Sequence, residues 1–301
     1  MIVGFPPPSS GGVHVAQILN ILKCFDLKAL YAESPARFYH VVAEAMKLAF
    51  ADRAHWLGDS EFADVPRGLI DKQYAATLAA RIDTDKTTEV PGHGQPPRWE
   101  HDLFGRPLDR HTTHIAAVDA AGNWVGITAT INTSFGSKVI VPGTGVILNN
   151  EMDDFAIAHE TPNTFGLVGA EANAVAAGKR PLSSMSPTIV LKDGQPILTL
   201  GAAGGPTIIS QVVLAIINHL DLGMDLAAAV AAPRLHHQWM PDKLRLEPSF
   251  DQTVREQLQD LGHKIDAKEP IGVTQAIGIE PDATTLIGVA DPRTAGRAAG
   301  M

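Results

Sequence analysis

The spacing of the apolar residues changes once along the chain, and this change constrains the fold more than any other feature of the sequence. Three early segments carry apolar side chains at helical spacing: residues 11–23, 35–53 and 71–82. Asp71 stands where it can cap the third of these helices. Residues 84–110 have no such period and are rich in proline, glycine, histidine and charge. This composition predicts an exposed linker that reaches residue 111.

Short segments with the period of β-strands follow the linker. Turn sequences separate two pairs of them, which are predicted to form hairpins: residues 114–118 with 124–130, and 186–191 with 196–200. Further helices are predicted at 207–220, 224–231 and 251–261, and further strands at 244–246, 275–279 and 285–290. Hairpins followed by helices, with helices also upstream, indicate an α+β fold with antiparallel sheet between helices. We therefore divide the chain into residues 1–111 and 112–301.

Composition excludes several classes of protein. The chain has 301 residues, of which 45% are apolar and 19% charged, enough to bury a sizeable core. The net charge of −9 argues against a partner such as nucleic acid or an anionic membrane. The longest apolar stretch, residues 208–220, is too short and too polar to span a bilayer. The single cysteine, Cys24, excludes an internal disulfide, and its apolar neighbours predict a buried thiol.

The linker meets the first predicted strand at Arg110-His111-Thr112-Thr113-His114. Taken alone, a pair of threonines before a strand is explained by β-propensity. Several motifs downstream of it occur together: Asn132-Thr-Ser-Phe-Gly136, Leu148-Asn-Asn-Glu-Met-Asp-Asp-Phe155, Arg180-Pro-Leu-Ser-Ser-Met-Ser-Pro187, Gly204-Gly205, Ala232-Pro-Arg-Leu-His-His-Gln-Trp239 and Asp291-Pro-Arg293. In this order they resemble the small subunit of the gamma-glutamyltranspeptidase family, over residues 112–301. With Pro6-Pro-Pro-Ser-Ser-Gly-Gly12 and Ala51-Asp-Arg53, residues 5–111 resemble the C-terminal part of that family's large subunit.

The resemblance implies an N-terminal nucleophile hydrolase, whose fold is an αββα sandwich. It also implies self-cleavage between His111 and Thr112, which would leave two fragments that bind each other. The Thr112 hydroxyl would then attack γ-glutamyl amides such as glutathione, with its own new α-amine as base. The acyl-enzyme would pass its γ-glutamyl group to water or to the amine of an amino acid or dipeptide.

The same resemblance assigns roles around Thr112. Thr130 would hydrogen-bond the Thr112 hydroxyl. Gly204 and Gly205 would donate backbone N–H groups to an oxyanion, because glycine allows the main chain a close approach. Taken without the resemblance, the two glycines are a plain turn before the helix predicted at 207–220.

The head group of the substrate needs acceptors for its ammonium and donors for its carboxylate. By resemblance, Asn132, Glu151 and Asp154 bind the α-ammonium, whereas acidic residues in a loop are otherwise usually only solvated. Ser183 and Ser184 would bind the α-carboxylate. Neither cofactor nor metal is implied, and we interpret His114, His236 and His237 as structural histidines.

A lid is predicted over this site at residues 155–169, with Phe165 at the position that usually carries a hydroxylated aromatic residue. Phenylalanine cannot hydrogen-bond Asn132, so we expect a looser gate. The presence of a lid favours a transpeptidase over the lidless, acylase-like relatives of the family.

Two alternatives stay open. A glutaryl or cephalosporin-type acylase is disfavoured by Glu151 and Asp154, since a glutaryl group has no ammonium. A catalytically silent fragment, or half of a split enzyme, is favoured by the absence of roughly the N-terminal half of a usual family precursor and disfavoured by the intact downstream motifs. That half would supply an arginine for the α-carboxylate and part of the sandwich, so a separate N-terminal segment is an expected partner. No residue of this chain is assigned the role of that arginine, and full activity without the segment would point to another group such as Arg180. Family members are usually exported, but residues 1–5 carry no secretory signal.

Overall fold

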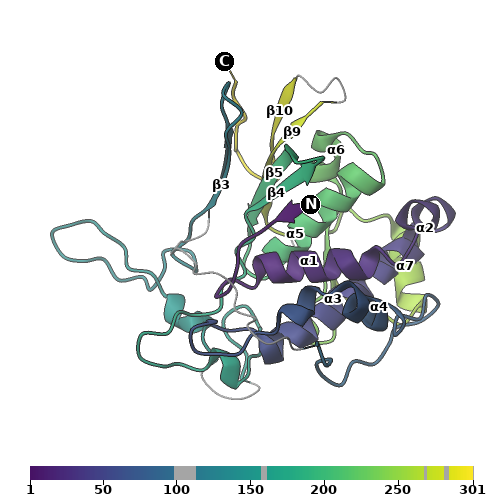
Figure 1. The fold of residues 1–301 in the computed structure, drawn as a ribbon, viewed down its shortest axis with the longest axis horizontal. Helices are drawn as coiled ribbons and strands as arrows, with labels where there is room; N and C mark the ends of the chain where they lie inside the picture. The colour runs from purple at the N-terminus through teal and green to yellow at the C-terminus, as the bar shows by residue number, and fades with distance from the viewer. Residues whose placement is uncertain (98–112, 157–160, 268–269, 281–284, 301) are drawn as a thin grey trace.

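A five-stranded antiparallel sheet lies at the centre of the computed structural model, which describes residues 1–97, 113–156, 161–267, 270–280 and 285–300 (Figure 1). In spatial order its strands are β1 (Ile2–Val3), β4 (Thr188–Lys192), β5 (Gln195–Ala203), β9 (Val273–Ile279) and β10 (Leu286–Ala290). β1 comes from the first residues of the chain and pairs with β4. The two parts of the chain on either side of the predicted linker therefore share one sheet.

The β4–β5 hairpin confirms the turn predicted from the sequence. Lys192 pairs with Gln195, so only Asp193 and Gly194 form the turn. Both have positive φ, 51° and 81°, the combination that a two-residue turn with the right twist requires.

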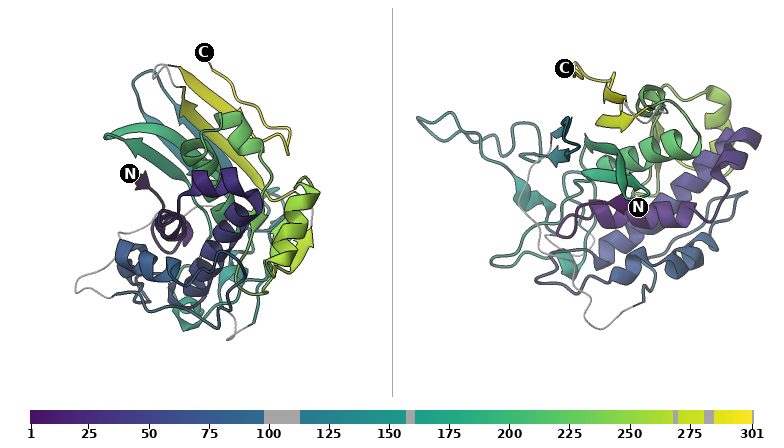
Figure 2. Two further views of the ribbon diagram at one scale, coloured as in Figure 1. Left: turned by 90° about the vertical axis from the view of Figure 1, so that its right-hand side faces the viewer. Right: turned by 45° about the horizontal axis from the view of Figure 1, so that its top comes forward.

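A second hairpin, β2 (His114–Val118) with β3 (Trp124–Thr128), covers one face of the sheet (Figure 2). The two sheets approach closely where the His114 ring lies against Gly201. A Cβ atom on Gly201 would stand only 2.3 Å from His114 Nδ1, so this contact requires glycine. The outward face of the hairpin leaves Ile115 and Val125 exposed, at 58% and 44%.

Helices cover the opposite face in two layers. α5 (Thr207–Ile216), which continues as a π-helical turn over Ile217–Asp221, and α6 (Leu226–Ala231) pack on the sheet. Behind them lie α1 (Gly11–Leu22), α3 (Pro35–Trp56), α4 (Lys72–Ala79) and α7 (Gln252–Asp260). The remaining elements are α2 (Leu27–Glu33), a small sheet of β6 (Leu235–His236), β7 (Leu244–Leu246) and β8 (Ile265–Ala267), and short 3-10 turns at Arg67–Ile70, Glu151–Asp154 and Glu171–Asn173. No helix in the described part of the chain is long and apolar enough to cross a membrane.

The predicted helices form within a few residues of their expected bounds. Asp71 caps α4 as expected, accepting hydrogen bonds from the N–H groups of Gln73 (2.8 Å) and Tyr74 (2.9 Å). α3 is buried along most of its length because it lies between α1, α2 and α7. The sequence analysis missed α2, β1, β6 and β8, which are short and lack a clear period.

The predicted exposure of the linker requires correction for residues 84–97. These residues form no helix or strand, as expected, yet buried side chains hold them. Asp52 accepts a hydrogen bond from Gly94 N (2.6 Å), and Glu44 accepts one from Thr88 N (2.9 Å). Val90 is only 7% exposed. Residues 98–112 lie outside the described residues, so the predicted cleavage point is not part of this description.

The prediction of a buried thiol at Cys24 is wrong, because the residue is exposed. Its apolar neighbours Leu22 and Leu27 are buried, but the chain turns between α1 and α2 and directs Cys24 outward. Sequence neighbours report burial only where the chain continues in a regular element.

Candidate active site

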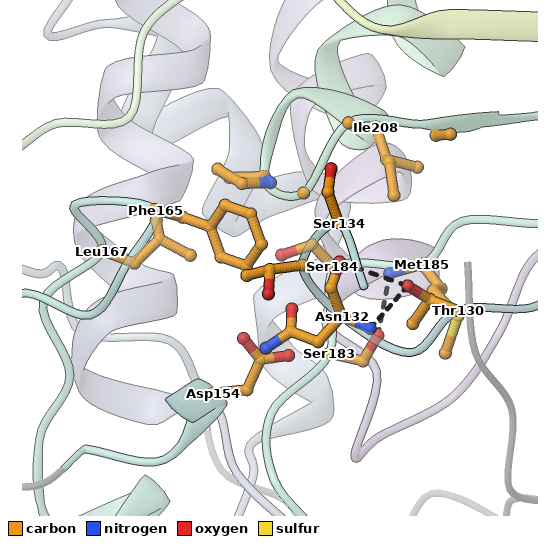
Figure 3. A pocket seen from close by; sticks show the side chains of 15 residues that line it. Thr130, Asn132, Ser134, Asp154, Phe165, Leu167, Ser183, Ser184, Met185 and Ile208 are labelled. Atoms are coloured by element: carbon orange, nitrogen blue, oxygen red, sulfur yellow. Dashed lines mark hydrogen bonds between the residues drawn. The ribbon is translucent and has the colours of Figure 1, made fainter. Parts of the chain in front are cut away.

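A cavity of about 340 Å³ opens at the end of β5, where several loops meet (Figure 3). Eight of the predicted site residues line it: Thr130, Asn132, Asp154, Phe165, Ser183, Ser184, Gly204 and Gly205. Glu151 does not line the cavity but interacts electrostatically with Asp154. Thr112, the predicted nucleophile, lies outside the described residues. The residue after it, Thr113, accepts a hydrogen bond from Ala129 N, next to Thr130.

One side of the cavity, the acidic side, is lined by Asn132 and Asp154, and we count with it Glu151, which is on the same turn as Asp154 but does not line the cavity. Asn132 has a positive φ of 73°, and its backbone N–H donates to Thr130 Oγ1 (2.8 Å). Its side chain donates to Asn150 O (3.2 Å), and this bond ties the loop after β3 to the turn that carries the two acids. In Figure 3 the Asn132 amide faces the Asp154 carboxylate.

The two acids are poorly hydrated and lie near each other. Burial raises the pKa of Asp154 to about 7, against the opposing effects of Arg53 and Asn132. Burial also raises the pKa of Glu151 to about 7, and the negative charge of Asp154 adds to this effect. An ammonium group bound here would favour the ionised forms of both, so the acidic side is suited to a cation.

The second side, the serine–glycine side, consists of Ser183, Ser184, Gly204 and Gly205. Ser183 Oγ accepts a hydrogen bond from Met185 N (3.1 Å), and Ser184 Oγ accepts one from Arg53 Nη2 (3.1 Å). Each hydroxyl therefore uses an oxygen lone pair on the protein and keeps its own proton for another acceptor. A carboxylate in the cavity is such an acceptor.

The proline- and serine-rich segment near the N-terminus fixes this pair of serines. Ser183 N donates to Pro8 O (3.0 Å), and Ser10 N donates to Ser183 O (2.8 Å). Ser9 Oγ also donates to Met185 O (2.6 Å). Two motifs that lie more than 170 residues apart in the sequence thus form one rigid border of the cavity.

Gly204 and Gly205 form the turn between β5 and α5, with φ of 143° and 59°. A Cβ atom on Gly205 would lie 2.8 Å from Phe165 Cδ1, so a larger residue would displace the ring. Neither glycine N–H has an acceptor among the described residues. Behind the turn, Gln211 donates to Ala203 O (3.1 Å) and accepts from Arg234 Nη1 (3.2 Å).

Two side-chain amides hydrogen-bond the backbone of the loop that carries Phe165. Asn163 Oδ1 accepts hydrogen bonds from the N–H groups of Phe165 and Leu167, both at 3.0 Å. Gln238 Nε2 donates to Phe165 O (3.2 Å) and Gly166 O (3.0 Å). Side-chain amides thus contact the backbone of the loop, and the looser gate expected from Phe165 stays a prediction.

Arg53 is the residue of this site that the sequence analysis missed. It appeared there only within the motif Ala51-Asp-Arg53, because helical spacing alone marks it as one more residue of a long helix. Arg180, which full activity of the chain alone would point to as a carboxylate-binding group, is held by Asp59 at 2.6 and 2.8 Å and by Glu61 at 3.1 Å. Its charge is therefore already compensated.

Two groups of histidines have acidic neighbours. His237 Nε2 lies 3.3 Å from Asp242 Oδ1. Within the described residues, one buried group has ligand atoms close enough for a metal ion: His40, Glu44 and His263. His40 Nδ1 lies 2.8 Å from His263 Nε2, and Lys47 Nζ lies 3.5 Å from Glu44 Oε1. The lysine thus supplies positive charge at the carboxylate.

Solved structures define the class of this fold. The cephalosporin acylase of Bacillus halodurans superimposes with a TM-score of 0.82 and is 28% identical, over 99% of this chain and 50% of the acylase chain. A chain of the Helicobacter pylori gamma-glutamyltranspeptidase T380A mutant is 46% identical with a TM-score of 0.59, over 61% of this chain and all of that one. The protein therefore has the α+β fold of the N-terminal nucleophile hydrolases.

Sequence comparisons define the family. The gamma-glutamyltranspeptidase family model matches residues 1–301. The glutathione hydrolase proenzyme of Escherichia coli K12 is 45% identical over 298 residues, which is 97% of this chain and 49% of that protein. The acylase ACY 1 proenzyme of Pseudomonas sp. SE83 is 39% identical over 94% of this chain and 47% of its own length. The chain belongs to the gamma-glutamyltranspeptidase family and spans about half the length of these curated relatives.

Proposed function

We propose that the protein transfers and hydrolyses γ-glutamyl groups, from glutathione and other γ-glutamyl amides, through an acyl-enzyme on Thr112. The observation that carries this proposal is the pairing of opposite chemistry in one cavity. Asp154 and Asn132 offer acceptors for an ammonium, while Ser183 and Ser184 offer donors for a carboxylate. An α-amino acid head group carries both charges on one carbon atom, so it can satisfy both sides at once.

The position of Thr113 supports the choice of nucleophile. Thr113 accepts a hydrogen bond from Ala129 N, and Thr130, the next residue, lines the cavity. Thr112 directly precedes Thr113 in the chain, and we propose it as the nucleophile on this ground. Cleavage of the bond between His111 and Thr112 would create an α-amine with a pKa of roughly 7.7–8.0, suited to a general base at neutral pH.

The chemistry would run in two balanced steps. The α-amine takes the proton of the Thr112 hydroxyl as the hydroxyl oxygen attacks the γ-carbonyl carbon. The resulting oxyanion accepts hydrogen bonds from the N–H groups of Gly204 and Gly205. The C–N bond breaks, the leaving amine takes the proton, and a γ-glutamyl ester remains. Water or an acceptor amine then attacks the ester and restores the threonine. Each oxyanion donor is worth about 10²–10³ in rate.

Exposed apolar surface supports a partner for this chain. Ile115 and Val125 lie on the outward face of the β2–β3 hairpin, where the fold class places a covering layer in an αββα sandwich. The segment after β3 projects from the body of the molecule with Phe135 and Ile140 exposed at 69% and 59% (Figures 1 and 2). A patch of this kind favours association. We propose that a further polypeptide segment of the family type covers this surface, and that γ-glutamyl transfer by the chain alone is weak.

Self-cleavage is the first test. Denaturing gel electrophoresis and N-terminal sequencing should show fragments of 111 and 190 residues (301 minus 111), the second beginning at Thr112. Thr112→Ala should abolish the cleavage, and Thr112→Ser should retain part of it. An intact chain after long incubation, with and without an added N-terminal segment from a related enzyme, would contradict the proposal.

The second test separates the proposed activity from an acylase. Release of a chromogenic aniline is measured from γ-glutamyl and from glutaryl anilides, again with and without the added segment. We expect turnover of the γ-glutamyl compound, since only it has an ammonium for Asp154. Preference for the glutaryl compound would identify an acylase, and no turnover of either in any combination would identify a silent fragment.

A further inference from the structure

Arg53 is a buried cation without a carboxylate in ion-pair contact. It lies near the C-terminal end of α3 and is only 4% exposed. Its Nε donates to Ser10 Oγ and its Nη2 to Ser184 Oγ, both at 3.1 Å. No carboxylate of the described residues lies within 4.0 Å of its guanidinium. Although burial lowers its pKa to about 10, the group stays charged at neutral pH. A cation in such a place requires compensation from nearby negative charge.

The hydrogen bond to Ser184 determines what that hydroxyl can do. A guanidinium can only donate, so Ser184 Oγ must be the acceptor. The Ser184 proton is then directed away from Arg53, and in the described part of the chain it has no acceptor. Ser184 lines the cavity, whereas Arg53 stands behind it and is not part of the lining. Arg53 therefore presents Ser184 to the cavity as a donor.

The same cation acts on the acidic side. Its charge stabilises the ionised form of Asp154 and opposes the effect of burial on that carboxylate. Asp154 in turn stabilises the charged form of Arg53. One side chain thus affects the group proposed to bind the ammonium and the group proposed to bind the carboxylate.

We infer that Arg53 is a positioning residue that makes this site select donors carrying an α-carboxylate beside an α-ammonium. It acts through the oriented hydroxyl of Ser184 and through the charge of Asp154, without touching the substrate. The inference rests on the proposed γ-glutamyl function. With Arg53, this chain itself supplies a cation near Ser183 and Ser184, which are proposed to bind the carboxylate. Arg180 is unsuited to this role because Asp59 and Glu61 hold it.

Two anilides that differ only in the α-carboxylate test this inference. The first is the γ-glutamyl anilide, and the second is the 4-aminobutyryl anilide, which keeps the ammonium and the acyl chain. The ratio of their kcat/KM values measures recognition of the carboxylate. Hydrogen bonds to a charged group predict a ratio of about 10 to 150 for the unaltered protein.

Substitutions at Arg53 should change this ratio and not only the overall rate. Arg53→Met should lower it about tenfold or more. Arg53→Lys keeps the charge but loses the planar fork, so it should lower the ratio less. Ser184→Ala should also lower the ratio of the two kcat/KM values. Adding Arg53→Lys to Ser184→Ala should lower this ratio no further, because both changes remove the same interaction. The matched control is Arg180→Lys, an arginine-to-lysine change at a position four residues before Ser184. It should leave the ratio unchanged.

The outcomes are distinguishable. If the unaltered protein turns over the γ-glutamyl anilide, and both Arg53 variants reduce the two substrates equally, Arg53 only supports the fold and this inference fails while the proposed function stands. Additive effects of Arg53→Lys and Ser184→Ala on the ratio would also overturn it. If Arg53→Met does not fold, the Arg53→Lys ratio and the double variant decide the matter. If the unaltered protein, with its added segment, releases no aniline, the proposed function fails and the inference with it.

Discussion

The two sides of the cavity are built in opposite ways. The acidic side comes from a loop and a 3-10 turn, and its properties depend on how poorly its carboxylates are hydrated. The serine–glycine side comes from the segment before β4 and from the turn between β5 and α5, and hydrogen bonds with residues 8–10 fix the serine segment. The properties of the acidic side thus depend on electrostatics, and those of the serine–glycine side depend on geometry.

This difference shows how one site can bind both charges of an amino acid. A cation needs negative charge and tolerates variable geometry, so two half-buried acids suffice. A carboxylate and a developing oxyanion need donors in fixed directions, so they require hydroxyls and N–H groups that the backbone cannot easily move. Substitutions on the acidic side should therefore change binding and its pH dependence, while self-cleavage should depend on the other side.

The largest expected effect tests this separation at Asp154. Asp154→Asn should raise KM for the γ-glutamyl anilide about 10- to 150-fold, because a charge-assisted contact worth about 1.5–3 kcal/mol is lost. Self-cleavage should stay nearly intact. Steady-state kinetics and gel electrophoresis measure the two properties on the same sample.

Asp153→Asn is the control for this substitution. Asp153 is on the same turn, but its carboxylate accepts a hydrogen bond from Thr164 N (3.1 Å) and does not line the cavity. The KM of the Asp153→Asn variant for the γ-glutamyl anilide should stay close to that of the unaltered protein. If Asp154→Asn binds donors normally and no longer cleaves itself, the two sides do not divide the work as described.

A smaller effect is expected from pH. The pKa values of Asp154 and Glu151 are raised to about 7, so their ionised forms decline as pH falls below 7. Donor binding that needs a carboxylate should then weaken, with KM rising up to about tenfold per pH unit. A donor without the ammonium, such as the glutaryl anilide, should not show this rise.

The raised pKa values of Asp154 and Glu151 affect the stability of the ligand-free protein in the direction opposite to their effect on donor binding. These acids bind protons more tightly in the folded state than in the unfolded chain, so their contribution to stability is full below about pH 4 and is lost as pH rises to about 7. Urea unfolding at several pH values measures this contribution to stability.

A KM for the γ-glutamyl anilide that stays flat between pH 8 and 6 would show that neither acid contacts the substrate ammonium.

The smallest expected effect concerns the loop of Phe165. Gln238→Ala removes the two hydrogen bonds to the loop backbone and should lower kcat/KM about fivefold, which corresponds to about 1 kcal/mol. Phe165→Tyr adds a hydroxyl without altering these bonds and should change kcat/KM less than Gln238→Ala does. A larger effect of Phe165→Tyr would mean that the aromatic hydroxyl controls the loop, as expected from the sequence.

The sequence predicted most of the regular structure because the relevant interactions are local. Asp193-Gly194 specifies a hairpin turn through backbone conformation alone, and Asp71 caps α4 by accepting a hydrogen bond from an N–H three residues ahead. The site residues were predicted differently, through their resemblance to a family. The structure brings all of them except Thr112 and Glu151 to one cavity, although they come from five separate segments.

The sequence by itself thus predicted the α+β pattern, the hairpins and eight of the residues that line the cavity. Only the tertiary structure decided that Arg53 stands behind Ser184, that residues 84–97 are tied to buried carboxylates, and that Cys24 is exposed. The physical reason is the range of the interactions. Turns and caps form within a few residues, whereas the partner of a buried polar group is chosen by packing between segments, here 131 residues apart for Arg53 and Ser184.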